Sequence, residues 1–514
     1  MNKLECRKGE NIKYIFFATA SFFITTICSM CSFLYPLHNR VDQNAFFTIG
    51  REMLAGKDVY TDLFDHKGTI TYLMHEIAAV FSQESMIGMY FFELIFMFIY
   101  LIFLYKIANL YMNQTKSVLI SVITATITTT TQCFLRGNNC EEFGYVLITV
   151  SLYYMLREKE QDDIVYLLNG IFTAFMLWSK FTLIGFWVGW ALVSYIPLLF
   201  GKEFKKFFRY VLMFILGFAV ITVPLFIYHL IRGNTYDFLY TYIYCNVVLY
   251  AKEITMFDRI KQILWTIGKN FSQNHIWAIV TFIGLAGFFR NNKYVHTFKK
   301  RISVLISFAT CYIVNYWGGV WYDYYLLILV PFAVFGVIYI VDAILYFSRL
   351  NSIYEKYKSV VAASVLCLCL AGVVFFSNTF PYLGKKAEEY PQIKIANKIE
   401  EICEEKGIEN PTMLNYAFID GGFYLASDIS PINKYFFRPN ISQEALPELY
   451  EQQMSIVANR EVDFLVTRTW KSRKLSQHID QEEVDLIESN YIPVMSADEI
   501  YDFYKFTLWI KIEE

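Results

Sequence analysis

The stretch VDQNAFFTIGREMLAGKDVYTDLFDHKGTITYLM, residues 41–74, follows the first long apolar segment of the chain. Its ionisable side chains include Asp42, Asp62, Asp65, His66 and Lys67, all in one connecting loop. A loop that only joins two apolar segments does not require this density of charge. The stretch therefore indicates a site for binding or chemistry.

Two apolar stripes run through the same region at helical spacing. The first is made of Phe46, Ile49 and Met53, and the second of Ile70, Leu73, Met74, Ile77 and Phe81. Each segment is too short, and too polar on its other side, to cross a bilayer. We expect two short helices that lie in the plane of the membrane interface.

The composition of the whole chain indicates a polytopic membrane protein. Of its 514 residues, 56 % are hydrophobic and 18 % are charged, whereas soluble domains hold roughly 25 % charged residues. The apolar residues fall in blocks of about twenty, the length that spans a bilayer as a helix. We expect about eleven transmembrane helices, over residues 14–35, 86–110, 117–134, 141–156, 164–179, 181–200, 210–231, 274–290, 302–317, 324–347 and 360–378.

The distribution of basic residues predicts the orientation of these helices. A basic N-terminus precedes residues 14–35, a run too long for the core of a signal peptide, so we expect an uncleaved helix with a cytoplasmic N-terminus. The loops at 157–163, 201–209, 290–301 and 349–358 hold most of the Lys and Arg residues of the short loops, so they are expected to be cytoplasmic. With an odd helix count, the first loop (36–85), residues 136–142, 232–269 and 317–323, and the C-terminal region then lie outside.

The composition changes near residue 380, which predicts two domains. Residues 1–379 form the transmembrane domain, and residues 380–514 form a small extracytoplasmic α/β domain. We expect helices at 391–406 and 443–458, and strands beginning at Thr412, Val462, Tyr491 and Tyr504. A net charge of −2 and the absence of a basic patch give no indication of a nucleic-acid partner.

Asp42 and Lys67 each allow two interpretations. Asp42 begins a predicted helix, so it is either an N-cap that bonds a backbone amide or a functional acid. Lys67 stands near the start of the second helix, where the helix dipole disfavours a cation. It either holds an anion together with the helix amides or extends its charge to the headgroup boundary.

Further polar groups are predicted on the same outer face. They are Arg136, Glu141 and Glu142 in LRGNNCEEFGY, Lys180 in LWSKF, and Tyr322, Asp323, Tyr324 and Tyr325 in WGGVWYDYY. A solvated loop or an aromatic belt would also account for them. Glu93 lies within an apolar span, where a carboxylate is costly unless it is paired. Gly185 and Gly189 form a G-x-x-x-G helix-packing pattern.

The first outer loop resembles that of the GT-C fold glycosyltransferases. The pattern Asp-x-x-x-Phe-Phe-x-x-x-Arg-x-Met-x-x-Gly, followed by YTDLFDHKG, is similar to bacterial relatives of the dolichyl-phosphate-mannose protein mannosyltransferases and to the lipid A aminoarabinose transferases. RGNNCEEF and LWSKF resemble the same group. The resemblance covers the first two hundred residues, and the later helices match only in layout.

The resemblance implies an enzyme that uses a polyprenyl-phosphate-linked sugar. It implies that Asp42 is the catalytic acidic residue and that Lys67 contacts the lipid phosphate. Further substrate-binding candidates, predicted on the same outer face, are Asp65, His66, Arg136, Glu141, Lys180, Tyr322 and Tyr324. Many relatives have two adjacent acids at the first position, but here the second is Gln43. We therefore expect a single base and no metal site, although a divalent metal is compatible with the sequence.

The expected reaction is the inverting transfer of a hexosyl or pentosyl group to a lipid or glycan acceptor of the cell envelope. The base would deprotonate the acceptor, and cations would stabilise the leaving phosphate. Alternatives are a lipid-linked glycan polymerase or ligase, a flippase or transporter, which would need paired repeats with midplane polar sites, and a non-catalytic scaffold. The charged first loop favours the transferase.

Overall fold

The computed structural model describes residues 3–159, 162–249, 254–290, 293–346, 348–501 and 503–513, and these residues form two compact units. The helical unit comprises Met1–Ser29, Tyr90–Leu225 and Glu253–Phe380. The loop-and-sheet unit comprises Met30–Met89, Phe226–Lys252 and Pro381–Glu514. The predicted boundary near residue 380 separates residues that cross the membrane from those that do not, and it stays a prediction.

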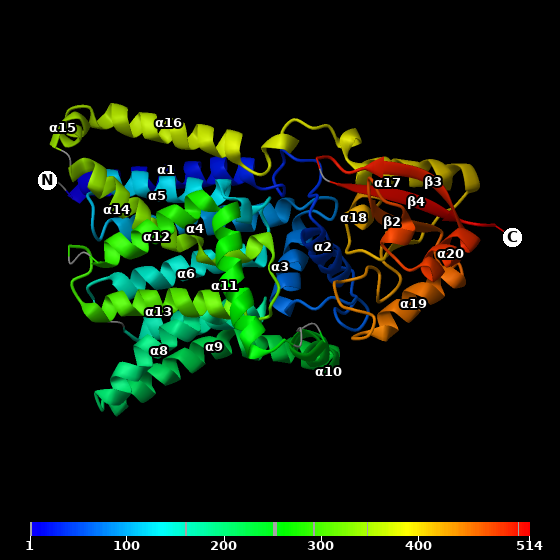
Figure 1. Cartoon of the computed structure of the whole chain (residues 1–514), viewed down its shortest axis with the longest axis horizontal. Coiled ribbons are helices and arrows are strands. Elements are labelled where there is room, and N and C mark those ends of the chain that lie inside the picture. Colours follow the sequence, from blue (N-terminus) through cyan, green and yellow to red (C-terminus); the bar gives the residue numbers. More distant parts are fainter. Residues whose placement is uncertain are drawn as a thin grey trace. The chain divides into compact units, whose positions relative to one another are not determined.

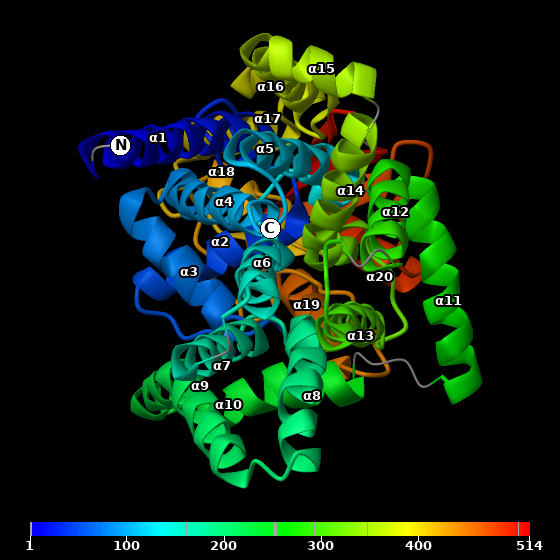
Figure 2. The ribbon, with the colours of Figure 1, turned by 90° about the vertical axis from the view of Figure 1, so that its left-hand side faces the viewer.

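The helical unit is a bundle of long apolar helices, which Figure 1 shows from the side and Figure 2 nearly end-on. Its helices, two of which extend into the other unit, are α1 (Lys3–Cys28), α4 (Ile87–Ala108), α5 (Gln114–Thr130), α6 (Cys140–Leu156), α7 (Asp163–Leu177), α8 (Gly185–Phe200), α9 (Phe204–Arg232), α11 (Met256–Gln273), α12 (His275–Arg290), α13 (Phe298–Asn315), α14 (Ala333–Tyr346), α15 (Ser348–Lys356) and α16 (Lys358–Phe376). Three 3-10 segments lie between them: η1 (Gln132–Phe134), η2 (Phe181–Ile184) and η4 (Asp323–Phe332).

Each of the eleven predicted apolar segments contains a helix of this bundle. Five helical stretches of the described residues are long and apolar enough to span a membrane: Ile87–Ala108, Phe181–Phe200, Phe204–Arg232, Asp323–Tyr346 and Lys358–Phe376. The total of about eleven spans stays a prediction. The first segment was predicted too long, because α1 ends at Cys28 although apolar residues continue to Tyr35. Residues 29–39 instead form turns in which Met30 and Tyr35 are buried.

The G-x-x-x-G pattern marks a close helix contact. A Cβ at Gly185 would lie 2.8 Å from the carbonyl oxygen of Thr310, and one at Gly189 would lie 2.7 Å from Cα of Ser307. Both neighbours belong to α13. The two glycines therefore allow the backbones of α8 and α13 to approach more closely than larger residues would permit.

Several short helices were not predicted. The expected outer segment 232–269 contains α10 (Thr235–Leu239), the π-helix η3 (Tyr240–Leu249) and most of α11. Phe257, Leu264 and Trp265 of α11 are exposed. The alternation of these apolar residues with polar ones makes the segment look like a loop in a hydropathy profile, although it is an amphipathic helix.

In the loop-and-sheet unit, the two helices predicted in the first loop are α2 (Val41–Leu54) and α3 (Thr69–Phe81). We expected the apolar stripe of α2 to lie in the membrane interface, but it does not. Its Phe46 and Ile49 are buried, because α3 packs against α2 so closely that a Cβ at Gly50 would lie 2.5 Å from the carbonyl carbon of His75. On α3 the end of the predicted stripe is exposed, with 62 % of Phe81 accessible. That face is suited to lie in the membrane interface.

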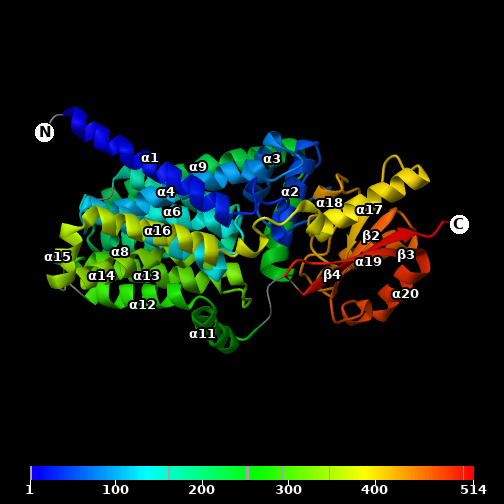
Figure 3. The same cartoon turned by 90° about the horizontal axis from the view of Figure 1, so that it is seen from above.

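The C-terminal segment forms an α/β fold, visible from above in Figure 3. Its four-stranded sheet has the order β1-β2-β4-β3, with β1 parallel to β2 and the other pairs antiparallel. The strands are β1 (Met413–Tyr416), β2 (Phe464–Trp470), β3 (Tyr491–Asp498) and β4 (Tyr504–Lys511), and the helices are α17 (Pro391–Lys406), α18 (Phe423–Ala426), α19 (Pro447–Ala458) and α20 (Gln481–Asn490).

Alternating side chains of the strands bury both faces of this sheet. Leu414 and Leu465 pack with Ile456 of α19 and Ile487 of α20 on one face. On the other face, Phe506 contacts Phe423 of α18, with ring centroids 4.9 Å apart. The predicted strands and the two predicted helices are confirmed, whereas α18 and α20 were not predicted.

Candidate active site

Asp42 lies in the first turn of α2. The N-cap position belongs to Arg40, so the alternative that Asp42 caps the helix is wrong. The helix begins at Val41, so Asp42 already lies inside its first turn. A carboxylate in the first turn of a helix interacts favourably with the helix dipole. The Asp42 side chain is half-buried.

The Asp65-His66-Lys67 segment is held by a buried tyrosine of α3. The Tyr72 hydroxyl donates to Oδ2 of Asp65 at 2.8 Å and accepts from the backbone amide of Lys67 at 3.0 Å. The other oxygen of Asp65 accepts from the amide of His66 at 2.8 Å. These bonds fix the turn that precedes α3, whose N-cap is Gly68.

A second tyrosine holds the opposite side of the same turn. Tyr60, which is fully buried, donates to the carbonyl oxygen of Lys67 at 2.8 Å and lies 3.0 Å from Oγ1 of Thr69. Because an amide oxygen can only accept, His229 donates from Nδ1 to Oδ1 of Asn234 at 2.7 Å, and its Nε2 accepts from Thr69 at 2.9 Å. The end of α9 is thereby connected to the Lys67 turn.

The charges of Asp42 and Lys67 both act on Asp65. Burial raises the pKa of the Asp65 carboxyl, the nearby Lys67 ammonium lowers it in part, and the Asp42 carboxylate raises it further. Both charges therefore lie within electrostatic reach of Asp65. The Lys67 ammonium lies 5.6 Å from the centre of the Phe46 ring on α2. The structure thus brings together four of the predicted residues: Asp42, Asp65, His66 and Lys67.

A second set of predicted residues meets within the helical unit. Nζ of Lys180, between α7 and η2, lies 2.5 Å from Oε1 of Glu141 in the first turn of α6, and both side chains are buried. The same ammonium lies 3.9 Å from the ring centre of Tyr325 and 5.1 Å from that of Tyr324. Tyr322 stacks on Tyr324. The ion pair therefore lies beside two tyrosine rings.

The remaining predicted groups surround the loop before α6. Arg136 is half-buried there. Glu93, which is fully buried, accepts from the Ser29 hydroxyl at 2.6 Å and from the Asn138 amide at 2.7 Å. The expected cost of a carboxylate in this span is offset by these hydrogen bonds. Among the described residues, no three His, Cys, Asp or Glu side chains are placed to hold a metal ion.

Sequence reasoning missed Tyr60, Tyr72, Thr69 and His229 as supports of the Lys67 turn. Their only signal is position, since two tyrosines and a threonine flank the charged segment closely. Nothing in the sequence indicates that His229, at the far end of α9, contacts Thr69.

Comparisons with known proteins agree with this architecture. Residues 65–231 match the model of the dolichyl-phosphate-mannose-protein mannosyltransferase family, which is less than half of the chain. ArnT from Cupriavidus metallidurans, solved bound to undecaprenyl phosphate, has a TM-score of 0.59 at 12 % identity, covering 97 % of this chain and 98 % of that chain. The chain has the GT-C fold.

Other matches support the GT-C assignment. Apo ArnT gives a TM-score of 0.59 at 11 % identity over 98 % of both chains. The Archaeoglobus fulgidus oligosaccharyltransferase tethered to an acceptor peptide gives 0.50 at 11 % identity over 93 % of this chain and 72 % of that one. No curated protein matches the chain in sequence. The predicted resemblance and the polytopic GT-C architecture with a small C-terminal sheet are confirmed.

Proposed function

We propose that this chain is a glycosyltransferase that moves a sugar from a polyprenyl-phosphate-linked donor to a cell-envelope acceptor at the outer face of the membrane. The observation that carries the proposal is the placement of Asp42 in the first turn of α2 and of the Lys67 ammonium 5.6 Å from the ring of Phe46, one turn further along the same helix. A base for the acceptor and a cation for a leaving phosphate are the two groups that this chemistry requires.

The proposed reaction is a single displacement that inverts the anomeric centre. The Asp42 carboxylate takes the proton of the acceptor hydroxyl as its oxygen bonds to the anomeric carbon. The bond from that carbon to the phosphate oxygen breaks through an oxocarbenium-like transition state. Its electron pair stays on the lipid phosphate, where Lys67 stabilises the growing charge.

The roles of the other predicted residues follow from their contacts. Asp65 and His66 hold the Lys67 turn through the bonds to Tyr72 and the backbone. Lys180 already pairs with Glu141, so we assign the phosphate charge to Lys67, and Arg136 stays a predicted substrate-binding residue. We assign Tyr322 and Tyr324 to the substrate as aromatic surfaces. The proposed chemistry requires no cofactor, and the expectation that the site holds no metal stays a prediction.

The test is a product assay with purified protein in nanodiscs. The protein is incubated with a panel of polyprenyl-phosphate hexoses and pentoses and with envelope lipids and glycans, and the products are identified by mass spectrometry. One sugar added per acceptor, with the opposite anomeric configuration, is expected. Chains of repeated units would indicate a polymerase, movement of the donor without a covalent product would indicate a flippase, and neither outcome would indicate a scaffold.

A further inference from the structure

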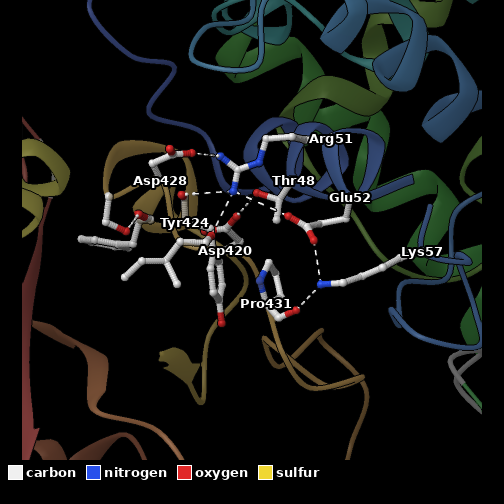
Figure 4. A network of polar contacts seen from close by, with 11 residues as sticks. Thr48, Arg51, Glu52, Lys57, Asp420, Tyr424, Asp428 and Pro431 are labelled. Atoms are coloured by element: carbon white, nitrogen blue, oxygen red, sulfur yellow. Dashed lines mark hydrogen bonds and ion pairs between the residues drawn. The ribbon is translucent and has the colours of Figure 1, made fainter. Parts of the chain in front are cut away.

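The C-terminal α/β segment contacts α2, the helix that carries Asp42, at three places along the end of that helix (Figure 4). Thr48 donates to Oδ2 of fully buried Asp420 at 2.7 Å. Arg51 donates to the carbonyl oxygens of Ile429 at 2.9 Å and Tyr424 at 3.4 Å. The sequence motif of the first loop contains Arg51, and the proposed reaction gives it no role.

Asp420, which accepts the bond from Thr48, is itself held by hydrogen bonds within the C-terminal segment. The other carboxylate oxygen of Asp420 accepts from the Asn415 side chain and from the Gly422 amide, both at 2.9 Å. Gly422 has φ +92°, and a Cβ there would lie 2.9 Å from the Asn44 side chain of α2. Only glycine fits this turn without strain. The turn therefore packs directly on α2.

A salt bridge completes these contacts at the end of α2. Glu52, 1 % exposed, pairs with Nζ of Lys57 at 2.7 Å, and that ammonium also donates to the carbonyl oxygen of Pro431 at 2.5 Å. Arg51 also pairs with Asp428 at 3.2 Å, but 90 % of the Asp428 side chain is exposed. Water screens that last interaction, so it contributes little.

The position of these contacts on the helix gives them a consequence for Asp42. Arg51 follows Asp42 by nine residues, so at about 100° per residue it lies on the opposite side of α2. If α2 turned by about 20°, a side chain about 5–6 Å from the axis would move by roughly 2 Å. A misplacement of about 1 Å can lower a rate about a hundredfold.

We infer that the Arg51 contacts with the C-terminal segment fix the rotation of α2 and thereby hold Asp42 in its reactive position. Arg51 is then a positioning residue, and the C-terminal segment is part of the catalytic unit. The inference rests on the proposed function, because it assumes that Asp42 is the base.

The test compares Arg51→Met with Arg438→Met. Arg438 is also a buried arginine of the C-terminal segment, bonded to Glu483 at 2.7 Å, but no α2 residue takes part in its described bonds to Glu483 and Gln453. Both changes are expected to lower the melting temperature. Only Arg51→Met is expected to lower kcat, by about tenfold or more, with little change in KM for the donor. Arg51→Lys should recover part of the rate.

Two further measurements separate this inference from the proposed function. In the Asp42→Asn background, Arg51→Met should cause no additional loss of kcat. The base is already absent there, so its position no longer affects the rate. Hydrogen exchange of the α2 amides should accelerate in Arg51→Met and not in Arg438→Met. If Arg51→Met does not fold, Thr48→Val, which removes one bond to Asp420, takes its place.

The possible failures are distinct. Equal kcat losses in Arg51→Met and Arg438→Met, or unchanged exchange in α2, would overturn the positioning role and leave the transferase intact. Full activity of Asp42→Asn would instead overturn the assignment of the base. Loss of donor binding alone in Arg51→Met would also contradict the inference.

Discussion

The hydroxyl group of Tyr72 donates to the carboxylate of Asp65 at 2.8 Å. The hydroxyl oxygen of Tyr72 also accepts from the backbone amide of Lys67. Tyr72 therefore holds both the buried acid and the residue that we propose as the phosphate ligand. The arrangement explains why an acidic residue is useful two positions before Lys67. Asp65 orients the turn through Tyr72 and does not need to contact the substrate.

The first prediction concerns the pH dependence of stability. Burial, the main influence, raises the pKa of Asp65 above its ordinary value of 3.8. A raised pKa means that the folded state binds the proton more tightly than the unfolded state. The stabilising contribution is therefore complete below about pH 4 and is lost as pH rises through the folded pKa.

The comparison that isolates this effect is with Asp65→Asn, which cannot titrate. From about pH 4 towards neutrality, the melting temperature of the wild type should fall relative to that of the variant, and the difference should then level off. Thermal unfolding in nanodiscs over this range measures it. A difference that is constant, or that grows in favour of the wild type, would contradict the prediction.

Asp42→Asn should lower the transfer rate by about 10²- to 10⁴-fold, the usual contribution of a general base, and leave folding intact. Asp62→Asn is the matched control, since Asp62 lies in the same loop and is exposed. Initial rates of product formation measure both. Wild-type turnover in Asp42→Asn would return Asp42 to a structural role at the start of α2.

Lys67→Met should lower turnover about a hundredfold or more, the scale seen when one charge-stabilising donor is lost. Lys67→Arg should recover part of the loss, because a planar guanidinium replaces a compact ammonium. The measurement is initial rate against donor-lipid concentration for each variant. A lysine that only reaches the headgroups would give near-normal turnover in both variants, which would leave Arg136 and Lys180 as the remaining candidates.

Removing one partner of the Glu141–Lys180 pair should destabilise the protein strongly. Lys180→Met leaves the buried Glu141 carboxylate unpaired, and loss of one partner of a buried pair costs about 3–5 kcal/mol. The double change Lys180→Met/Glu141→Gln should restore much of the stability. Unfolding measurements complete the cycle, with Lys398→Met as the control, because its partner Glu401 is 54 % exposed and the pair should contribute little. Additive effects would mean that the two charges are not coupled.

The orientation in the membrane can be tested with fused reporters. A reporter after Lys385 should lie outside the cytoplasm, and one after Arg209 should lie inside, because the short basic loops favour the cytoplasmic side. Protease protection or compartment-specific fluorescence distinguishes the two sides. Both reporters on the same side would refute the predicted topology.

The long apolar helices could be predicted from the sequence because their residues fall in blocks of the length that spans a bilayer. The charged residues between these blocks could be singled out as candidates because charge is rare in such a chain. The sequence did not predict which face of α2 is buried, since an apolar stripe looks the same whether it meets lipid or α3. It also did not predict the contact of Arg51 with Ile429 and Tyr424. That contact joins segments far apart in the chain and uses backbone carbonyls, which every residue has.

The neutral pair of Glu141 and Lys180 has a consequence for an energised membrane. Moving one elementary charge across a potential of 100 mV changes its energy by about 2.3 kcal/mol. Two opposite charges 2.5 Å apart present only a small dipole to that field. The field therefore changes the energy of the pair by only a small fraction of that amount, so the geometry of the pair should be the same in respiring and de-energised cells.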